Sequence, residues 1–544
     1  MSKKFLLLLE KIIGKFLSLK KKEKIIFFVF LSLFFFGSFS LIYQFYLRYS
    51  KVIPIEGGVL KLGLIGQPRY INPILTRDND ADRFLIELLY NGLLKVDGKG
   101  NLKNDLASKI EISQDGKTFL VFLKENIFWH DGVPFSSDDI IFTIEAIQNK
   151  EYKSPLRETW QGVIVEKISP SVVRFTLNKS NRSFLDNLTL KILPKHIWEN
   201  ISPKSFPLTD YNIKPIGTGP FLFENLEKNN KGDILSYTLV RNEHYFENKP
   251  YIFKIKFFFY DNYSQMKTAF LKKEIDGLLN LYFEDFNYFA QKKNYQIYKL
   301  KLNRYFAVFY NLDKNLFQDK NLREALELSI NKKAMENNLL KNRAVLLDSP
   351  FDLLETEGNY QYNPEKAKEL IKGKDISFTL SLPEDDQLIK VAQFLKEEWQ
   401  KIGINVELEI LPIKELEREV ILPKSYESLL FGEIVDLSFD LFPFWHSSQA
   451  NSYKLNLSSF KNKDLDELIE ENWNADENKR MEIFQKMKEI FQKEKPALFL
   501  YNPYYLYVLP KKIQGHNIKR ANIPAEIFSD VSYWYMKVER ILKW

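Results

Sequence analysis

The chain has 544 residues, 45% hydrophobic and 15% aromatic, with a formal net charge of +7 at pH 7. That composition is ample for large hydrophobic cores in two to four domains. No cysteine occurs, which excludes disulfides, cysteine-based zinc sites and a lipid-modified cysteine. The basic charge lies mostly in lysines near the N-terminus, and no basic stripe follows, so nucleic acid is not an expected partner.

The first 50 residues predict a membrane anchor. A lysine-rich, amphipathic segment, residues 1–24, precedes an uncharged apolar run from Ile25 to Tyr43. We therefore expect a transmembrane helix at residues 25–46, with the N-terminus in the cytoplasm and the bulk of the chain outside it. A cleaved signal peptide is the alternative, because residues 37–40 are small enough to suit a peptidase. The apolar run is longer than the about 7 to 15 residues usual in such peptides, which favours the anchor.

The remainder mixes strands and helices and contains no repeat of the kind that builds a solenoid. Alternating apolar residues predict strands at 59–64, 118–123, 172–177, 235–240, 252–259 and 305–310. Helical spacing predicts helices at 82–94, 138–148, 321–338, 363–371, 387–402, 464–472 and 478–491. Asn363 and Pro364 form a typical helix start, with a capping side chain before a first-turn proline.

Sites for catalysis are not evident in the sequence. Five histidines are scattered without metal-ligand spacing, so no metal is expected. Residues 217–220 are rich in glycine but lack the lysine of a phosphate loop, which indicates a tight turn. The adjacent carboxylates Asp138 and Asp139 lie at the start of a predicted helix, where negative side chains interact favourably with the helix dipole. We therefore expect no catalytic residue and no cofactor.

A series of unusual segments nevertheless follows one order along the chain. They are Asn72-Pro73, Asn91-Gly92-Leu93, Asp115-Gly116, Phe128-Trp129-His130-Asp131-Gly132, Pro215 to Phe221, Arg241-Asn242, Leu322 to Leu326 and Asn363-Pro364. This order resembles the family 5 solute-binding proteins of ABC importers, the group that contains oligopeptide-, dipeptide- and nickel-binding receptors. The resemblance covers nearly all of the chain after Gly57.

The resemblance implies a fold of mixed α/β (α+β) class. The expected architecture is a two-lobe, periplasmic-binding-protein-like clamp of type II with the extra subdomain of family 5, preceded by one N-terminal transmembrane helix. The implied boundaries are 51–304 for lobe I with an inserted subdomain at about 91–210, 305–500 for lobe II, and 501–544 for a return to lobe I. Such clamps close on their ligand by hinge motion.

The resemblance also implies that ligand contacts cluster in the cleft between the lobes. The candidates are Thr76, Arg77, Trp445, His446, Ser447, Gln449, Asn451 and Asn456. Trp445 is the first choice, because an aromatic ring beside hydroxyl, amide and imidazole groups can bury an extended solute. The alternative, that Phe444 and Trp445 belong to the core, stays open.

One departure concerns the ligand. Oligopeptide receptors place an aspartate shortly after a tryptophan to pair with the peptide's amino group, whereas Ser447, Ser448 and Gln449 follow Trp445 here. Peptide is therefore the ligand implied by the family and not by these residues. A sugar, another polar solute or a metal chelate, which His446 could serve, stays open.

The expected function is a membrane-anchored, extracytoplasmic binding protein that is not an enzyme. It would capture an oligopeptide-like solute as a monomer and deliver it to an ABC permease and its ATPase. Two alternatives from other classes are a surface hydrolase with cleft carboxylates and a tethered chaperone or adhesion module that binds polypeptides.

Overall fold

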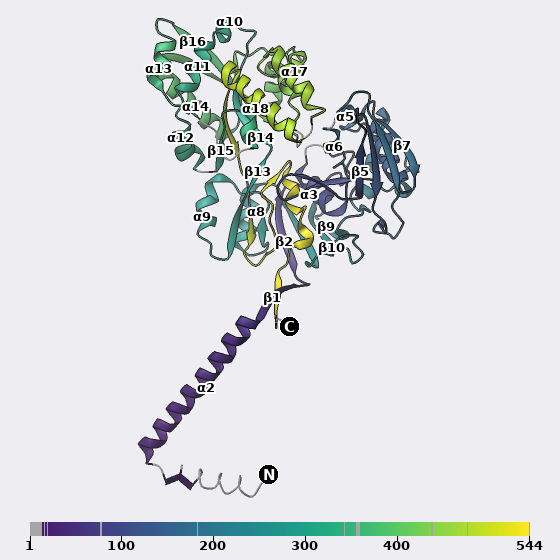
Figure 1. Cartoon of the computed structure of the whole chain (residues 1–544), viewed down its shortest axis with the longest axis vertical. Coiled ribbons are helices and arrows are strands. Elements are labelled where there is room, and N and C mark those ends of the chain that lie inside the picture. The colour runs from purple at the N-terminus through teal and green to yellow at the C-terminus, as the bar shows by residue number, and fades with distance from the viewer. Residues whose placement is uncertain are drawn as a thin grey trace. The chain divides into compact units, whose positions relative to one another are not determined.

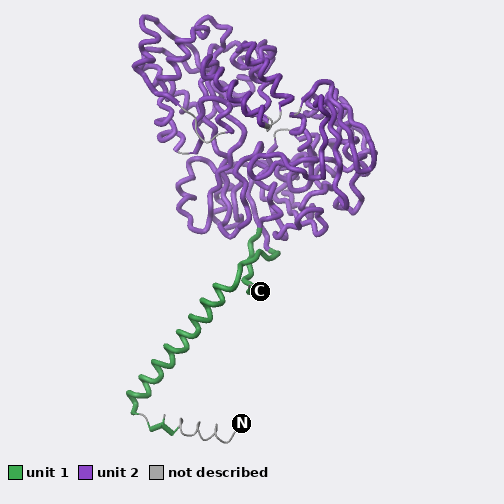
Figure 2. Tube along the Cα trace, viewed as in Figure 1, with its two compact units in different colours: residues 1–57, 535–544 green, residues 58–534 purple. Residues whose placement is uncertain are grey.

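The computed structural model describes residues 14, 15, 17, 18, 20–76, 79–181, 183–341, 343–354, 360–436, 439–475 and 477–542. The chain divides into two compact units (Figure 2), one made of residues 1–57 and 535–544 and the other of residues 58–534.

The first unit contains a long helix, α2 (Lys21–Tyr49), followed by a two-stranded ribbon. Among the described residues, α2 is the one helix with the length and apolar composition to cross a membrane, and none of its side chains is buried in the protein. In the ribbon, β1 (Ser50–Ile55) pairs antiparallel with β22 (Lys537–Leu542). Arg540 donates to the Ser50 hydroxyl at 3.0 Å, and the Tyr46 hydroxyl donates to the Arg540 carbonyl at 2.9 Å. The C-terminal strand is thus bonded to the end of the apolar helix.

The second unit contains two large mixed sheets (Figure 1). The first sheet has the order β21 (Arg520–Ala521), β13 (Tyr295–Leu302), β20 (Tyr505–Pro510), β12 (Gly277–Leu278), β2 (Val59–Ile65), β11 (Lys254–Tyr260), β10 (Ile234–Arg241) and β9 (Phe221–Lys228). The second sheet has the order β15 (Ala344–Leu346), β19 (Ala497–Pro503), β14 (Arg304–Tyr310), β18 (Ser428–Ile434), β16 (Ile376–Pro383) and β17 (Ile404–Leu411).

The two large sheets are joined at two points by single residues. Asn303 connects β13 of the first sheet to β14 of the second, and Tyr504 connects β19 of the second sheet to β20 of the first. Asn303 is held on both sides, because its side chain donates to Asn522 at 2.8 Å and its carbonyl accepts from the amide of Val435 at 2.8 Å. Two short crossings of this kind are where a hinge between two bodies can form.

Smaller sheets precede β9 in the chain. A four-stranded antiparallel sheet has the order β5 (Ala107–Ile112), β6 (Thr118–Leu123), β8 (Val172–Thr176) and β7 (Ile164–Ser169). A hairpin of β3 (Leu94–Val96) and β4 (Leu102–Asn104) lies before it in sequence. All these strands fall within residues 91–210, where the sequence predicts an inserted subdomain. The predicted domain boundaries themselves stay a prediction.

Both faces of the second sheet are covered by apolar cores. Strand β14 alternates between them, with Val308 and Tyr310 in one core and Tyr305, Ala307 and Phe309 in the other. The first core includes residues of α11 (Lys320–Leu328), α13 (Pro364–Leu370) and α14 (Asp386–Lys401), and the second includes residues of α17 (Lys463–Asn472) and α18 (Glu477–Glu494). Burial on both faces explains why strand β14 is almost continuously apolar after Arg304.

The other α-helices are short or lie beside the first and small sheets. They are α3 (Asp80–Leu89), α4 (Ser137–Gln148), α5 (Arg157–Trp160), α6 (Phe184–Asn187), α7 (Lys195–Trp198), α8 (Tyr263–Leu271), α9 (Phe286–Ala290), α10 (Asn315–Gln318), α12 (Lys332–Met335), α15 (Ile413–Glu415) and α16 (Phe442–Trp445).

Most of the strands and helices that the sequence predicts lie within two or three residues of their predicted limits. One helix prediction is wrong: residues 321–338 do not form a continuous helix, because α11 ends at Leu328 and α12 begins at Lys332. The Asn331 side chain accepts from the amide of Ala334 at 2.9 Å and so caps a second helix. The predicted helix at 82–94 also ends earlier, at Leu89.

Residues 217–219 form a buried turn against the end of α3. A Cβ atom on Gly217 would lie 1.7 Å from the Leu89 carbonyl oxygen, so only glycine fits there. Thr218 between the glycines is buried, and its hydroxyl donates to the Asn91 side chain at 3.1 Å. The segment therefore serves packing, as the sequence predicts for a tight turn.

Candidate solute-binding site

A cavity of about 1440 Å³ opens at the carboxyl ends of two parallel strands of the first sheet, β2 and β11. Its wall includes Gly66 and Gln67, which follow β2, and Asp261, which follows β11. Ligands of open α/β sheets bind outside the carboxyl ends of parallel strands, because the connecting loops diverge there. The cavity is thus where the topology favours a binding site.

Gln67 ties two loops of the wall together. Its side-chain amide donates to Asp233 at 3.3 Å, and its side-chain oxygen accepts from the amide of Ile234 at 2.8 Å. Its carbonyl accepts from the side chain of Asn79 at 2.9 Å. Asn79 also caps α3 by accepting from the amide of Ala81 at 2.9 Å. The loop after β2 is therefore fixed both to the β9–β10 hairpin and to the start of α3.

The side chain of Asp82 also holds the loop that follows β2. Its side chain is buried, and one carboxylate oxygen accepts from the amides of Arg69 at 2.7 Å and Tyr70 at 3.0 Å. Burial raises the pKa of Asp82 to about 6, against the opposing effect of these two amides. Asp82 shapes the cavity wall as a structural group.

The described part of the cavity wall is acidic overall. Among the described lining residues, two side chains are basic, Arg69 and Lys231. Five of these lining residues carry carboxyl groups: Asp80, Asp82, Asp233, Asp261 and Glu274. The hydrogen bond from the Asn229 side chain keeps the pKa of Asp233 below its usual value. An excess of carboxylates favours a solute that brings a positive group into the cavity.

The two candidates predicted from lobe I have different outcomes. Thr76 lines the cavity, where its hydroxyl donates to the carbonyl of Tyr70. Arg77 lies outside the described residues.

Trp445 lies in the core on one face of the second sheet. It is 1% exposed, and its indole nitrogen donates to the Tyr305 hydroxyl at 3.1 Å. The ring packs edge-on to Phe491, with centroids 4.7 Å apart, and lies 5.8 Å from the ring of Phe499. The packing role that the sequence left as an alternative is therefore present. Contact of Trp445 with a solute stays a prediction.

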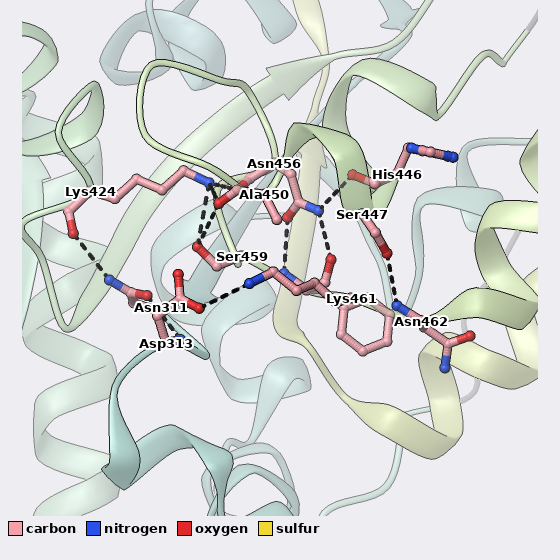
Figure 3. Close-up of polar contacts among 11 residues, drawn as sticks. Asn311, Asp313, Lys424, His446, Ser447, Ala450, Asn456, Ser459, Lys461 and Asn462 are labelled. Atoms are coloured by element: carbon pink, nitrogen blue, oxygen red, sulfur yellow. Dashed lines mark hydrogen bonds and ion pairs between the residues drawn. The ribbon is translucent and has the colours of Figure 1, made fainter.

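The other candidates lie on the loop that follows Trp445, and hydrogen bonds among its own residues and from Lys424 hold this loop (Figure 3). The Asn456 side chain is fully buried and donates to the carbonyls of Phe460 at 2.9 Å and His446 at 3.3 Å. The Ser447 hydroxyl accepts from the amide of Asn462 at 3.1 Å. The ammonium group of Lys424 donates to the carbonyls of Ala450, at 2.7 Å, and Asn456. These residues have structural partners.

The remaining candidates lie on the outer part of this loop. Nδ1 of His446 accepts from the amide of Ser448 at 3.1 Å, and Nε2 lies 3.5 Å from Glu470. Gln449 is half-buried and donates to the Ser448 hydroxyl at 3.3 Å, whereas Asn451 is exposed. None of residues 445–456 belongs to the described lining of the cavity at β2 and β11. Their role in solute contact stays a prediction.

The sequence did not identify most of the cavity wall. Gln67 and Asp261 lie within three residues of the ends of two strands that the sequence predicts, at 59–64 and 252–259. The missing information was that these strands pair in parallel although nearly 200 residues separate them. Had that pairing been known, the loops after them would have been the first candidates.

A protein-family comparison gives this cavity a context. Residues 101–462 match the model of the bacterial extracellular solute-binding proteins, family 5. The chain belongs to this family. Its members bind solutes for ABC import and are not enzymes, and they act outside the cytoplasm.

Individual relatives of family 5 extend over most of the chain. The oligopeptide-binding protein AppA of Bacillus subtilis is 26% identical over 518 residues, covering 89% of this chain and 93% of AppA. The structure of AppA with a nonapeptide has a TM-score of 0.67 at 25% identity, covering 89% of this chain and all of AppA. NikZ of Campylobacter jejuni in complex with Ni(L-His) has a TM-score of 0.68 at 26% identity, covering 88% of this chain and 99% of NikZ. The mixed α/β, periplasmic-binding-protein-like fold predicted from the sequence is confirmed.

Proposed function

We propose that this family 5 protein is a membrane-anchored receptor that binds an oligopeptide-like solute in the cavity at β2 and β11 and delivers it to an ABC permease. The observation that carries the proposal is the cavity itself. Its volume of about 1440 Å³ exceeds the about 300 to 1,000 Å³ of pockets that hold drug-sized ligands, so it suits a longer solute.

The charge of the wall supports a peptide. A peptide brings a free amino group, and the carboxylates of Asp80 and Asp261 lie in the wall. They could pair with this group in place of the aspartate that the family places after the tryptophan. The similarity to AppA, whose structure contains a nonapeptide, covers 89% of this chain.

The N-terminal helix supports the anchor. Helix α2 has 29 residues, which corresponds to a length of about 44 Å and exceeds the about 30 Å of a bilayer core. Tyr43, Tyr46 and Tyr49 lie towards its end, where aromatic side chains favour the membrane interface. The ribbon of β1 and β22 continues directly from this end. An uncleaved chain would thus carry its C-terminal strand at the outer membrane surface.

A charge-reversal experiment tests the cavity. Full-length protein in detergent is titrated with a mixture of synthetic peptides, and bound peptides are identified by mass spectrometry. We expect Asp261→Lys to weaken peptide binding ~10-fold or more, because it replaces an acceptor for the amino group by a like charge. Asp375→Lys, an equal change at an exposed site outside the lining, is the control and should bind as the wild type does.

Two results would contradict the proposal. Equal binding by both variants would remove the cavity as the peptide site. Binding of unfolded proteins without any limit on length, and of no short peptide, would favour the chaperone or adhesion alternative.

A further inference from the structure

One part of the cavity wall is formed by the segment that follows β12. Asn280 and Tyr282 of this segment line the cavity, and a short 3-10 turn (Phe283–Asp285) and helix α9 come directly after them. The Tyr282 ring stacks on the Tyr263 ring, with centroids 4.1 Å apart and an angle of 3° between the planes. Tyr282 is 44% exposed, so its ring is accessible to a solute. The position of this segment therefore decides where an aromatic surface borders the cavity.

Residues 280–286, here called the wall segment, are bonded to the first sheet and its helices. The amide of Leu281 donates to the carbonyl of Leu506 on β20 at 2.8 Å. The ammonium group of Lys267 on α8 lies 2.7 Å from the carboxylate of Asp285. Phe286 packs against the apolar core that includes residues of β12 and β20. The wall segment thus belongs to the first sheet.

Arg343 reaches the wall segment from the second sheet. It directly precedes β15, an edge strand of that sheet. Its Nη1 donates to the carbonyl of Phe283, and its guanidinium lies 5.1 Å from the centroid of the Phe283 ring and 5.0 Å from that of Phe286. At these distances a guanidinium is attracted to both aromatic rings. Arg343 therefore links the two sheets beside the cavity.

The backbone of Arg343 is bonded to one of the two crossings between the sheets. Its carbonyl accepts from the amide of Tyr504 at 3.0 Å, and Tyr504 is the single residue between β19 and β20. The ammonium group of Lys299 on β13 lies 5.5 Å from the ring centroids of both Tyr504 and Phe286. Arg343 is thus held at both ends, by the crossing and by the wall segment. A displacement at the crossing therefore acts on the wall segment.

An arginine is unfavourable here for packing alone. Arg343 is 4% exposed, and its Nε has no hydrogen-bond partner among the described residues. A buried cation loses its water, and hydrogen bonds and aromatic rings must compensate for the loss. An apolar side chain would fill the same space without an unmet donor. The arginine adds a directed, charge-assisted bond to the Phe283 carbonyl, next to the cavity residue Tyr282.

We propose that Arg343 is a positioning residue for solute binding, which holds Tyr282 against the cavity from the second sheet. The inference rests on the proposed function, in which the solute occupies the cavity at β2 and β11. Arg343 is not among the described lining residues, so it acts through Phe283 and does not contact the solute. Without it the wall segment has to be ordered when the solute binds, and this cost lowers the affinity.

Hydrogen exchange of the full-length protein in detergent tests the positioning without a solute. In Arg343→Met the amides of residues 281–286 should exchange ~10-fold faster than in the wild type, because the bond to Phe283 is lost. The amides of β14 and β16, inside the second sheet, should change by less than about threefold. This difference separates a local loss of order from a general loss of stability.

A double-mutant cycle tests the effect on binding. The probe is the mixture of synthetic peptides used for Asp261→Lys. Arg343→Met and Tyr282→Ala should each weaken binding ~5-fold, which is the size of the ordering cost of one side chain. The double variant should bind within about twofold of Tyr282→Ala alone, because Arg343 acts through Tyr282. If Arg343→Met does not fold, Arg343→Gln takes its place in both measurements.

Arg323→Met is the matched control. Arg323 is 5% exposed and donates to the carbonyls of Phe317 at 2.6 Å and Glu494 at 2.7 Å, and none of these residues belongs to the described lining of the cavity. Its loss should lower stability and leave peptide affinity within about twofold of the wild type.

Three outcomes overturn the inference. Unchanged exchange at residues 281–286, or unchanged affinity of the folded Arg343 variants, would remove the positioning role and leave peptide binding intact. Independent effects, with a double variant ~25-fold weaker than the wild type, would show that Arg343 does not act through Tyr282. Binding of no peptide by the wild type would overturn the proposed function and the positioning role together.

Discussion

Replacing Trp445 by alanine should lower the free energy of unfolding and leave the affinity for the solute nearly unchanged. The side chain is 1% exposed, packs against Phe491 and Phe499, and donates to Tyr305. A buried tryptophan removes about 150 to 250 Å² from water, which corresponds to about 4 to 6 kcal/mol at about 25 cal/mol per Å² as an upper bound. Measured truncations of buried aromatic residues cost about 3 to 5 kcal/mol.

Trp399 is the matched comparison. It is fully buried on the other face of the second sheet, and its indole nitrogen donates to the carbonyl of Leu326 at 3.1 Å. Trp399→Ala should therefore cost a similar free energy of unfolding. Trp445→Phe should cost about 1 to 2 kcal/mol, because it keeps a ring and loses the hydrogen bond to Tyr305.

Urea unfolding of the full-length variants, followed by circular dichroism, measures stability. Peptide titration at low urea measures affinity. We expect Trp445→Ala and Trp399→Ala to change affinity by less than about threefold. If Trp445→Ala alone lost ~10-fold or more in affinity, and its stability matched that of Trp445→Phe, the packing argument would be refuted. Trp445 would then be the solute anchor predicted from the sequence.

Three further predictions concern pH, packing and the anchor. Burial raises the pKa of Glu433 to about 8. Between about pH 4.5 and 8 the folded protein keeps this proton whereas the unfolded chain loses it, so the free energy of unfolding of the wild type falls by up to about 1.4 kcal/mol per pH unit as the pH rises. Glu433→Gln should not show this fall. Gly217→Ala should lower the free energy of unfolding by more than about 2 kcal/mol, towards the upper range of ordinary substitutions. The reason is that its Cβ atom would meet the Leu89 carbonyl oxygen. Intact mass spectrometry of membrane-extracted protein should detect the full N-terminal segment.

Each of these has a control and a contradicting outcome. The Tyr305 hydroxyl donates to Glu433, so Tyr305→Phe tests that contact; equal pH profiles of Glu433→Gln and the wild type would contradict the buried acid. Gly37→Ala, where a Cβ meets nothing within 4 Å, should leave stability unchanged, and an equally mild effect of Gly217→Ala would contradict the close approach. A mature chain that begins near Ser40 would contradict the anchor.

The sequence predicts local structure well where local patterns determine it. Strand β6 has the predicted limits, 118–123, because its apolar residues alternate towards the core. Helix α13 begins at Pro364, and the Asn363 side chain accepts from the amide of Lys366 at 3.0 Å, as the capping pattern indicates. The break at residues 329–331 escaped prediction, because Asn331 caps a new helix inside a stretch with continuous helical spacing.

The site is less accessible from the sequence for a physical reason. Aromatic residues suit both a cleft and a core, so the composition around Trp445 did not separate the two environments. The cavity wall depends on the parallel pairing of β2 with β11, which no local pattern records.

The most direct test of peptide capture is the content of the protein as it leaves the cell. Full-length protein is extracted from membranes, purified without added solute, denatured, and its released contents are analysed by mass spectrometry. We predict peptides of restricted length with free amino and carboxyl ends. Release of sugars or metal chelates, with no peptide, would contradict the proposed ligand and the role given to the acidic wall.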